Sequence, residues 1–136
     1  TIGLSLSGSA REVIGAEIVP EAVKDAKENA GINSINNAKF FCCDASEVAE
    51  KLKKFNENLD AVIIDPPRKG CSLKLIEDVI KMEPKKIAYV SCNPATLARD
   101  LKIFSENSDF KIKKVIPVDM FPRTSHVETT VILERK

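Results

Sequence analysis

Short apolar runs recur along the chain, and each is too short to form a helix. Several are rich in valine and isoleucine, which is typical of strands buried on both faces of a parallel sheet. The predicted strands are 13–16, 39–42, 59–64 and 87–90. Two later runs, 111–118 and 127–133, are joined by a segment that contains Pro122 and Arg123, and they could pair as antiparallel strands.

Helical periodicity fills the intervals between these runs, with apolar residues three or four positions apart. In 20–30, Pro20 stands where a first helical turn accepts proline, and Gly31 is placed to end the helix. The other predicted helices are 46–55, 75–80 and 97–104, the last beginning near Ala95. Strands alternating with helices, followed by a hairpin-like tail, predict an α/β fold with a doubly wound sheet.

Length and composition favour one domain, because 136 residues with 43% hydrophobic content can bury a substantial core. The sequence contains no apolar run of about 18 residues and no basic-then-apolar leader, so it predicts a cytoplasmic protein without a membrane partner. Its 21 Lys+Arg and 20 Asp+Glu leave a net charge of +1. That balance argues against a domain that holds nucleic acid by bulk electrostatics, so we expect any RNA contact to be local or to lie elsewhere.

Acidic residues follow three of the predicted strands, at the edge where ligands bind in doubly wound sheets. Glu17 follows the first strand, Asp44 the second and Asp65 the third. A carboxylate at such a position can accept hydrogen bonds from both hydroxyls of a ribose, and Glu17 fits that role. The residues alone leave two alternatives open: Glu17 as a solvated strand-end acid, and Asp44 as a cap for the helix at Ser46.

Asp65 is followed directly by Pro66 and Pro67, and then by Arg68-Lys69-Gly70. Two prolines remove two backbone donors and fix two φ angles, so the carboxylate is presented on a stiff loop. Such a preorganised acceptor suits a small planar substrate. The plainer alternative is a rigid turn that merely ends a strand.

The four cysteines show no C-x-x-C spacing and are accompanied by one histidine, so neither a zinc site nor a disulfide framework is predicted. Cys92 follows the strand 87–90 and precedes the helix near Ala95. Its sulfur should therefore lie at the ligand edge of the sheet and near a helix N-terminus, which favours a thiolate nucleophile. Position alone leaves packing equally open, since cysteine is often buried. The cysteines interpreted as packing residues are Cys42, Cys43 and Cys71.

Four stretches carry a specific combination of motifs over essentially the whole chain. In order they are VIGAEIVPEAVKDAKENA, DAVIIDPPRKGC, YVSCNPATLARDL and VDMFPRTSHVETTVIL. Together they resemble the catalytic domain of the S-adenosylmethionine-dependent RNA uracil-C5 methyltransferases, which make 5-methyluridine in 23S ribosomal RNA and in transfer RNA. The resemblance implies a Rossmann-like class I methyltransferase fold, and it favours chemistry over packing for Cys92.

The resemblance also implies a mechanism, in which a cysteine adds to C6 of a uracil, C5 takes the methyl group, and a base removes the C5 proton. Cys92 of SCNP matches the nucleophile and Glu128 of HVET matches the base. Asp65 of DPPR matches the acidic residue near the pyrimidine and the cofactor. Glu17 and Asp44 match the positions that hold the ribose and adenine of S-adenosylmethionine.

His126 is the only histidine, and the resemblance leaves it as a scaffold or RNA-contacting residue rather than the base. The implied partner is RNA, with 23S ribosomal RNA favoured over transfer RNA by overall resemblance, and no oligomeric state is predicted. Two other classes compete with this interpretation. A nicotinamide-dependent dehydrogenase would share the alternating pattern but has no use for Asp-Pro-Pro beside a strand-end cysteine, and an inactive fragment would serve only as a folded α/β domain.

The chain departs from the family at its start. Members carry a strand and a glycine loop, roughly D-x-Y-C-G-x-G, before T-I-G-L, whereas this chain opens at Thr1. We therefore expect 1–136 to be a C-terminal catalytic domain without the first central strand, the glycine loop and the amino-terminal RNA-binding module. Such a fragment should bind S-adenosylmethionine poorly. Its sheet should leave a gap, pair the strands ending at Glu17 and Asp65 directly, or borrow a strand from a neighbour.

Overall fold

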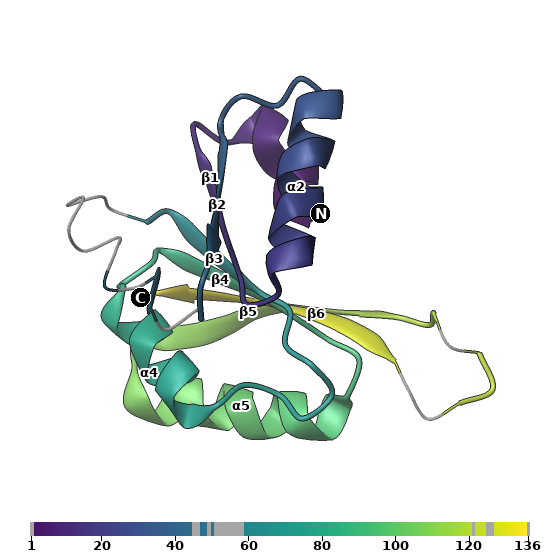
Figure 1. Cartoon of the computed structure of the whole chain (residues 1–136). Helices are drawn as coiled ribbons and strands as arrows, with labels where there is room; N and C mark the ends of the chain where they lie inside the picture. Colours follow the sequence, from purple (N-terminus) through teal and green to yellow (C-terminus); the bar gives the residue numbers. More distant parts are fainter. Residues whose placement is uncertain are drawn as a thin grey trace. The chain divides into compact units, whose positions relative to one another are not determined.

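The computed structural model describes residues 2–44, 47, 48, 50, 59–120, 122–124 and 127–135 (Figure 1). The chain divides into two compact units, Thr1–Phe55 and Asn56–Lys136. The predicted helix 46–55 lies almost entirely outside the described residues. The assignment of 1–136 to a single domain stays a prediction.

The first unit is a two-stranded parallel sheet with a long helix beside it (Figure 1). In chain order it contains α1 (Ile2–Leu6), the 3-10 turn η1 (Ser7–Ser9), β1 (Val13–Glu17), α2 (Pro20–Ile32) and β2 (Ala38–Cys42). The parallel register pairs Glu17 with Cys42, so both strands end at the same edge. Strand, helix and parallel strand in succession confirm the predicted α/β pattern for this unit.

The end of α2 differs from its prediction. The helix runs through Gly31 to Ile32, and the backbone N–H of Asn33 caps it by bonding to the carbonyls of Asn29 and Gly31. Gly31 does not end the helix because it does not take up the left-handed conformation that a glycine cap requires. That conformation falls to Ser34, with φ of 55°.

The second unit is a four-stranded mixed sheet in the order β3-β4-β6-β5. Its elements are β3 (Ala61–Ile64), α4 (Leu73–Lys81), β4 (Lys86–Ser91), α5 (Pro94–Asn107), β5 (Phe110–Val118) and β6 (Glu128–Arg135). β3 and β4 are parallel, and β6 is antiparallel to both of its neighbours. The predicted antiparallel pair is therefore confirmed, and β6 lies between β4 and β5, which the sequence did not predict.

The core of the second unit lies between its sheet and its helices, with α4 and α5 on the same face (Figure 1). Its buried residues include Ile76, Val79, Ile87, Tyr89, Leu97, Phe104, Val131 and Leu133. The prediction of strands buried on both faces is wrong, since Ile63 in β3 remains 38% exposed. The reason is that both helices cover one face, so residues of β4 and β6 alternate between buried and partly exposed.

The described strands form two sheets, in which β1 pairs with β2 and β3 pairs with β4. How the chain accommodates the missing central strand stays a prediction. None of the helices in the described ranges has the length and apolar character that a bilayer span requires.

Candidate active site

Cys92 lies in a short, internally bonded turn between β4 and α5. The Ser91 hydroxyl accepts a hydrogen bond from the Asn93 backbone N–H at 3.1 Å and donates one to the Asn93 carbonyl at 3.1 Å. The Asn93 side chain in turn caps α5 by accepting from Ala95 N at 3.1 Å, and Pro94 occupies the first helical turn. Cys92 itself is half-buried. Its backbone is therefore held between a strand end and a capped helix start.

Cys92 and Glu128 each lie next to the last residue pair of the ladder between β4 and β6. The antiparallel register pairs Ser91 of β4 with Thr129 of β6, and both of these residues are buried. Cys92 is one residue beyond Ser91 and Glu128 is one residue before Thr129, so both lie next to the last pair of the ladder. The sheet thus places the predicted nucleophile and the predicted base at the same edge.

Asp65 leaves the sheet at the same edge. β3 runs parallel to β4 with Ile64 opposite Tyr89, so Asp65 emerges within a few residues of Cys92 along the neighbouring strand. Its side chain is exposed. The carboxyl ends of β3 and β4 and the amino end of β6 therefore contribute Asp65, Cys92 and Glu128 to one edge of one sheet.

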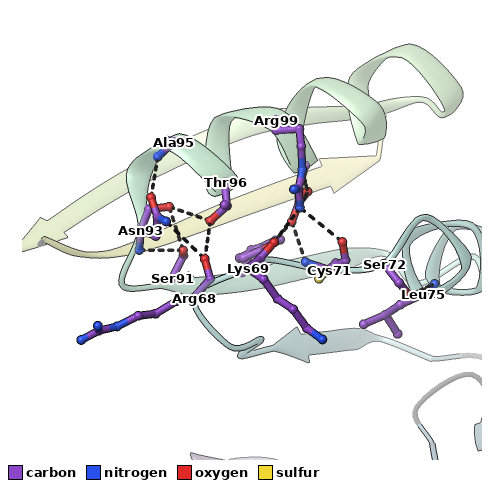
Figure 2. A network of polar contacts seen from close by, with 12 residues as sticks. Arg68, Lys69, Cys71, Ser72, Leu75, Ser91, Asn93, Ala95, Thr96 and Arg99 are labelled. Carbon is purple, nitrogen blue, oxygen red and sulfur yellow. Dashed lines mark hydrogen bonds and ion pairs between the residues drawn. The ribbon is translucent and has the colours of Figure 1, made fainter.

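The loop after Asp65 is bonded to the first turns of α5 (Figure 2). The carbonyl of Arg68 accepts from the Asn93 side-chain amide at 3.2 Å and from the Thr96 hydroxyl at 3.2 Å. The side chains of Arg68 and Lys69 are exposed and extend away from the helix, while their carbonyls face it (Figure 2). The loop is therefore attached to the helix through its backbone, which leaves two cationic side chains available to solvent.

One turn further along α5, a buried carboxylate continues the attachment. Asp100 is 0% exposed, and its Oδ2 accepts from the backbone N of Cys71 at 2.8 Å and from the Tyr89 hydroxyl at 2.6 Å. Its Oδ1 faces the Arg99 guanidinium, with Nη2 at 2.7 Å. Arg99 also donates to the carbonyls of Lys69 at 3.0 Å and Cys71 at 3.3 Å. This charge is paired and hydrogen-bonded, as a buried carboxylate must be.

Gly70 lets the loop approach these side chains. Its φ is +78°, and a Cβ built there would lie 2.6 Å from both Asp100 Oδ2 and Arg99 Nη2. A side chain at this position would combine an unfavourable backbone conformation with a direct clash. The close contact between the loop and α5 therefore depends on glycine.

Burial and hydrogen bonding keep two groups in this region protonated. Burial raises the pKa of the Cys71 thiol. Burial also raises the pKa of the Tyr89 hydroxyl, and its hydrogen bond to Asp100 raises it further. Tyr89 is therefore a stable hydrogen-bond donor, and Cys71 is not a thiolate at neutral pH.

The other cysteines divide by exposure. Cys71 and Cys43 are buried, as their interpretation as packing residues requires. Cys42 is exposed, so that interpretation is wrong for it. Neighbouring residues at the end of a strand point to opposite sides, and here Cys43 takes the buried side.

The two acidic residues of the first unit lie at the carboxyl edge of its sheet. Glu17 ends β1, and its carboxylate accepts from Val19 N at 3.0 Å. Asp44 follows β2, and its backbone carbonyl accepts from Glu47 N at 2.9 Å, which fits a position at the start of a helix. Both side chains are exposed. Glu17 and Asp44 thus belong to the edge of the first unit, whereas Asp65, Cys92 and Glu128 belong to the second.

The interpretation of the sequence missed the residues of α5 that bond the loop. Asn93, Thr96 and Asp100 are spaced three and four residues apart, which places them on one side of the helix. A polar stripe at that spacing, in a helix that also needs an apolar stripe, is a signal that could have found them. His126 lies outside the described residues. Within the described ranges, no three His, Cys, Asp or Glu side chains gather into a metal-binding group.

Solved structures with this fold include methyltransferases. A Pyrococcus abyssi tRNA (uracil-54, C5)-methyltransferase, crystallised with S-adenosyl-L-homocysteine, superposes with a TM-score of 0.81 at 35% identity. The match covers 96% of this chain and 31% of that protein. An rRNA methylase from Streptococcus thermophilus shares the fold at a TM-score of 0.75 and 14% identity, covering 99% of this chain and 82% of that one. The Rossmann-like methyltransferase fold expected from the motifs is thereby confirmed.

Sequence relatives agree. Proteins described as uncharacterized RNA methyltransferases from Bacillus cereus and Oceanobacillus iheyensis are each 50% identical, over 135 and 136 residues. These matches cover 99% and 100% of this chain, which spans 29% of either relative. The model of the family described as tRNA (uracil-5-)-methyltransferase matches residues 1–136. The chain therefore belongs to the tRNA (uracil-5-)-methyltransferase family.

Proposed function

We propose that this chain forms the catalytic domain of an enzyme that methylates C5 of a uridine in RNA, through a covalent bond between Cys92 and C6 of the uracil. The observation that carries the proposal is the register of β4 and β6, which places Cys92 and Glu128 next to the last pair of their ladder. Asp65 emerges at the same edge on a loop stiffened by two prolines.

Cys92 acts as the nucleophile. Uracil C5 is a weak nucleophile, and addition of the Cys92 thiolate to C6 moves the electrons of the C5–C6 double bond toward C5 and the O4 carbonyl. α5 begins two residues after Cys92, so the nucleophile is held between the end of β4 and the start of a helix. Cys92 is only half-buried, which suits a residue that must meet a base extruded from the RNA.

Glu128 acts as the general base. Once C5 carries both a methyl group and its original hydrogen, the Glu128 carboxylate removes that proton, and the electrons of the C5–H bond restore the C5–C6 double bond as the Cys92 thiolate leaves. Glu128 is half-buried and is the first residue of β6. It acts after Cys92 in the reaction. Asp65 lies near both the pyrimidine and the cofactor and orients them beside these two groups.

The methyl donor is S-adenosylmethionine, which supplies an electrophilic methyl group on a sulfonium ion when bound. Glu17 and Asp44 fit its nucleoside part, because both are exposed carboxylates at the carboxyl edge of β1 and β2. The bond from Val19 N to one Glu17 oxygen fixes the carboxylate at the strand end. Its other oxygen can then accept from ribose hydroxyls.

The target RNA has two candidates. Overall resemblance of the motifs favours 23S ribosomal RNA. The alternative is transfer RNA, which the name of the Pyrococcus abyssi protein and the description of the matching family support. The two can be separated by offering the protein, at its natural length, 23S fragments and unmodified tRNA transcripts in parallel.

Nucleoside analysis of the product tests the proposed reaction itself. RNA treated with the protein and S-adenosylmethionine carrying a labelled methyl group should yield labelled 5-methyluridine after digestion to nucleosides. Label in a 2′-O-methyl nucleoside, in a methylated purine or in protein would contradict the proposal. None of these products requires a cysteine nucleophile and a general base at the end of a strand.

A further inference from the structure

We propose that Asp100 is a positioning residue for this reaction, holding the loop 65–71 so that Asp65 is kept beside Cys92. The inference rests on the proposed function and adds to it residues that do not touch the substrate. The loop clamp consists of four residues of α5 and its cap, namely Asn93, Thr96, Arg99 and Asp100. Figure 2 shows the first three of them beside the loop.

The clamp binds the backbone of the loop at three residues. Asn93 and Thr96 hold the carbonyl of Arg68. Arg99 holds the carbonyl of Lys69, and Arg99 and Asp100 together hold the carbonyl and N–H of Cys71. These contacts join residues 25 to 30 positions apart in the chain, so they set the tertiary position of the loop rather than its local shape.

The loop transmits its attachment to Asp65. Between Asp65 and the first clamped residue, Arg68, stand only Pro66 and Pro67, whose rings fix their φ angles. A stiff connection of two residues passes a displacement at Arg68 on to the Asp65 carboxylate. Asn93 belongs to the clamp and directly follows Cys92, so the nucleophile and the loop share one anchor.

Asp100 is the centre of the clamp because it is the buried member. Its two oxygens receive donors from the loop, from β4 and from Arg99 at distances of 2.6 to 2.8 Å. Replacement by asparagine keeps the size of the side chain but exchanges one acceptor oxygen for an N–H₂ group. That group must then face either the Arg99 guanidinium or the Cys71 N–H and Tyr89 hydroxyl, so one side of the clamp is lost.

The test compares Asp100→Asn with Asp78→Asn in the protein at its natural length. Asp78 is a partly buried acid of α4 that pairs with Lys81 and lies outside the loop clamp. Asp100→Asn should lower kcat about a hundredfold, the size of effect expected when a reacting group is misplaced by about 1 Å. The KM for S-adenosylmethionine should stay within about threefold, because Glu17 and Asp44, which fit the nucleoside part of the cofactor, lie in the other unit. Asp78→Asn should leave both parameters within about twofold.

A second variant covers the case in which Asp100→Asn does not fold. Thr96→Val removes the hydroxyl that bonds Arg68 from a half-buried site and keeps the shape of the side chain. It should lower kcat about fivefold with the same unchanged KM, since Asn93 still holds the Arg68 carbonyl. Folded variants of Asp100 or Thr96 with normal kcat, or with a raised KM for S-adenosylmethionine and normal kcat, would overturn the role of the clamp.

Cys92→Ala in the same assay separates this inference from the proposed function. Retained methylation by Cys92→Ala would overturn the proposed function itself. An inactive Cys92→Ala together with a fully active Asp100→Asn would overturn only the positioning role. The positioning role would be supported if Asp100→Asn is slow and if, among folded variants at position 100, only the original aspartate or Asp100→Glu restores kcat.

Discussion

The carboxyl ends of the two sheets are built differently, although both carry the acidic residues that the sequence singles out. At the edge of the first unit, Glu17 is exposed and its carboxylate bonds to Val19, two residues away. At the edge of the second unit, the loop after Asp65 is bonded to α5 through contacts between residues 25 to 30 positions apart. The Glu17 carboxylate is thus held by a local backbone contact, whereas the loop after Asp65 is held by side chains of a helix distant in the sequence.

This difference fits two different tasks. A cofactor that binds and leaves in every cycle can be held by exposed carboxylates, which give up and regain water at low cost. A covalent step needs its nucleophile, base and orienting acid fixed before the substrate arrives, because small displacements are expensive in rate. Changes at the second edge should therefore affect turnover, and changes at the first edge should affect cofactor affinity.

The largest effect is expected at Cys92. Cys92→Ala should lower methylation by about four orders of magnitude or more, because the alternative route, direct attack by C5, lacks activation. The measurement is transfer of labelled methyl to RNA by the protein at its natural length. Cys42→Ala, which removes an exposed cysteine from the first unit, is the matched control and should stay within about twofold. Near-normal turnover by Cys92→Ala would mean that the edge of the second unit does not carry out the reaction.

Glu128→Gln should come next, with turnover reduced by about a thousandfold and a protein–RNA adduct accumulating. The amide cannot accept the C5 proton, so Cys92 cannot leave. The adduct should be visible as a slowly migrating band on a denaturing gel. Glu134→Gln, in the same strand but paired with Lys86 at its far end, should form no such band. A slow Glu128→Gln variant without an adduct would mean that Glu128 acts before methyl transfer rather than after it.

Glu17→Gln should have a smaller effect of a different kind. Loss of a charged acceptor for the ribose should weaken binding of S-adenosylmethionine about tenfold, with kcat at saturating cofactor unchanged. Binding can be measured by calorimetry and turnover by methyl transfer. Glu21→Gln in the first turn of α2 is the control, because Glu21 is an exposed acid of the same unit. A fall in kcat without a change in affinity would erase the contrast between the two edges.

The smallest effect is the pH dependence of stability that Tyr89 contributes. Its pKa is raised above the ordinary value of 10.0, so its stabilisation is complete below pH 10 and is lost as the pH rises further and the unfolded tyrosine ionises. Denaturant unfolding of the 136-residue chain and of Tyr89→Phe should therefore differ most below pH 10. The difference should shrink by about 1 kcal/mol over the next pH unit. A difference that stays constant through this range would mean that the hydroxyl ionises freely in the folded chain.

Local patterns predicted most of the fold. The apolar run at 87–90 forms β4. It stands between two predicted helices and is too short to be a helix itself, so a strand was the natural prediction. The position of β6 between β4 and β5 was not predicted, since strand order depends on contacts between distant segments. The predicted end of α2 was wrong although it rests on a local signal. Glycine is permitted at a helix end but is not required there, and Ser34 took the left-handed conformation instead.

The candidate site divides in the same way. Strand-end positions and motifs were enough to single out Cys92 and Glu128, and the register of two strands then placed both at the end of one ladder. The role of Asp100 was not predicted, because its partners Cys71 and Tyr89 are 29 and 11 residues away and carry no periodic relation to it. A buried carboxylate is visible only when the packing around it is known.

RNA that carries 5-fluorouridine at the target position provides the most direct test of the central claim. Fluorine cannot be removed from C5 as a proton, so the covalent intermediate should persist after methyl transfer. Mass spectrometry of the protein digested after incubation with this RNA and S-adenosylmethionine should find the modified pyrimidine on Cys92. Modification of Cys42, Cys43 or Cys71 instead, or methylation that proceeds with no adduct, would contradict the account.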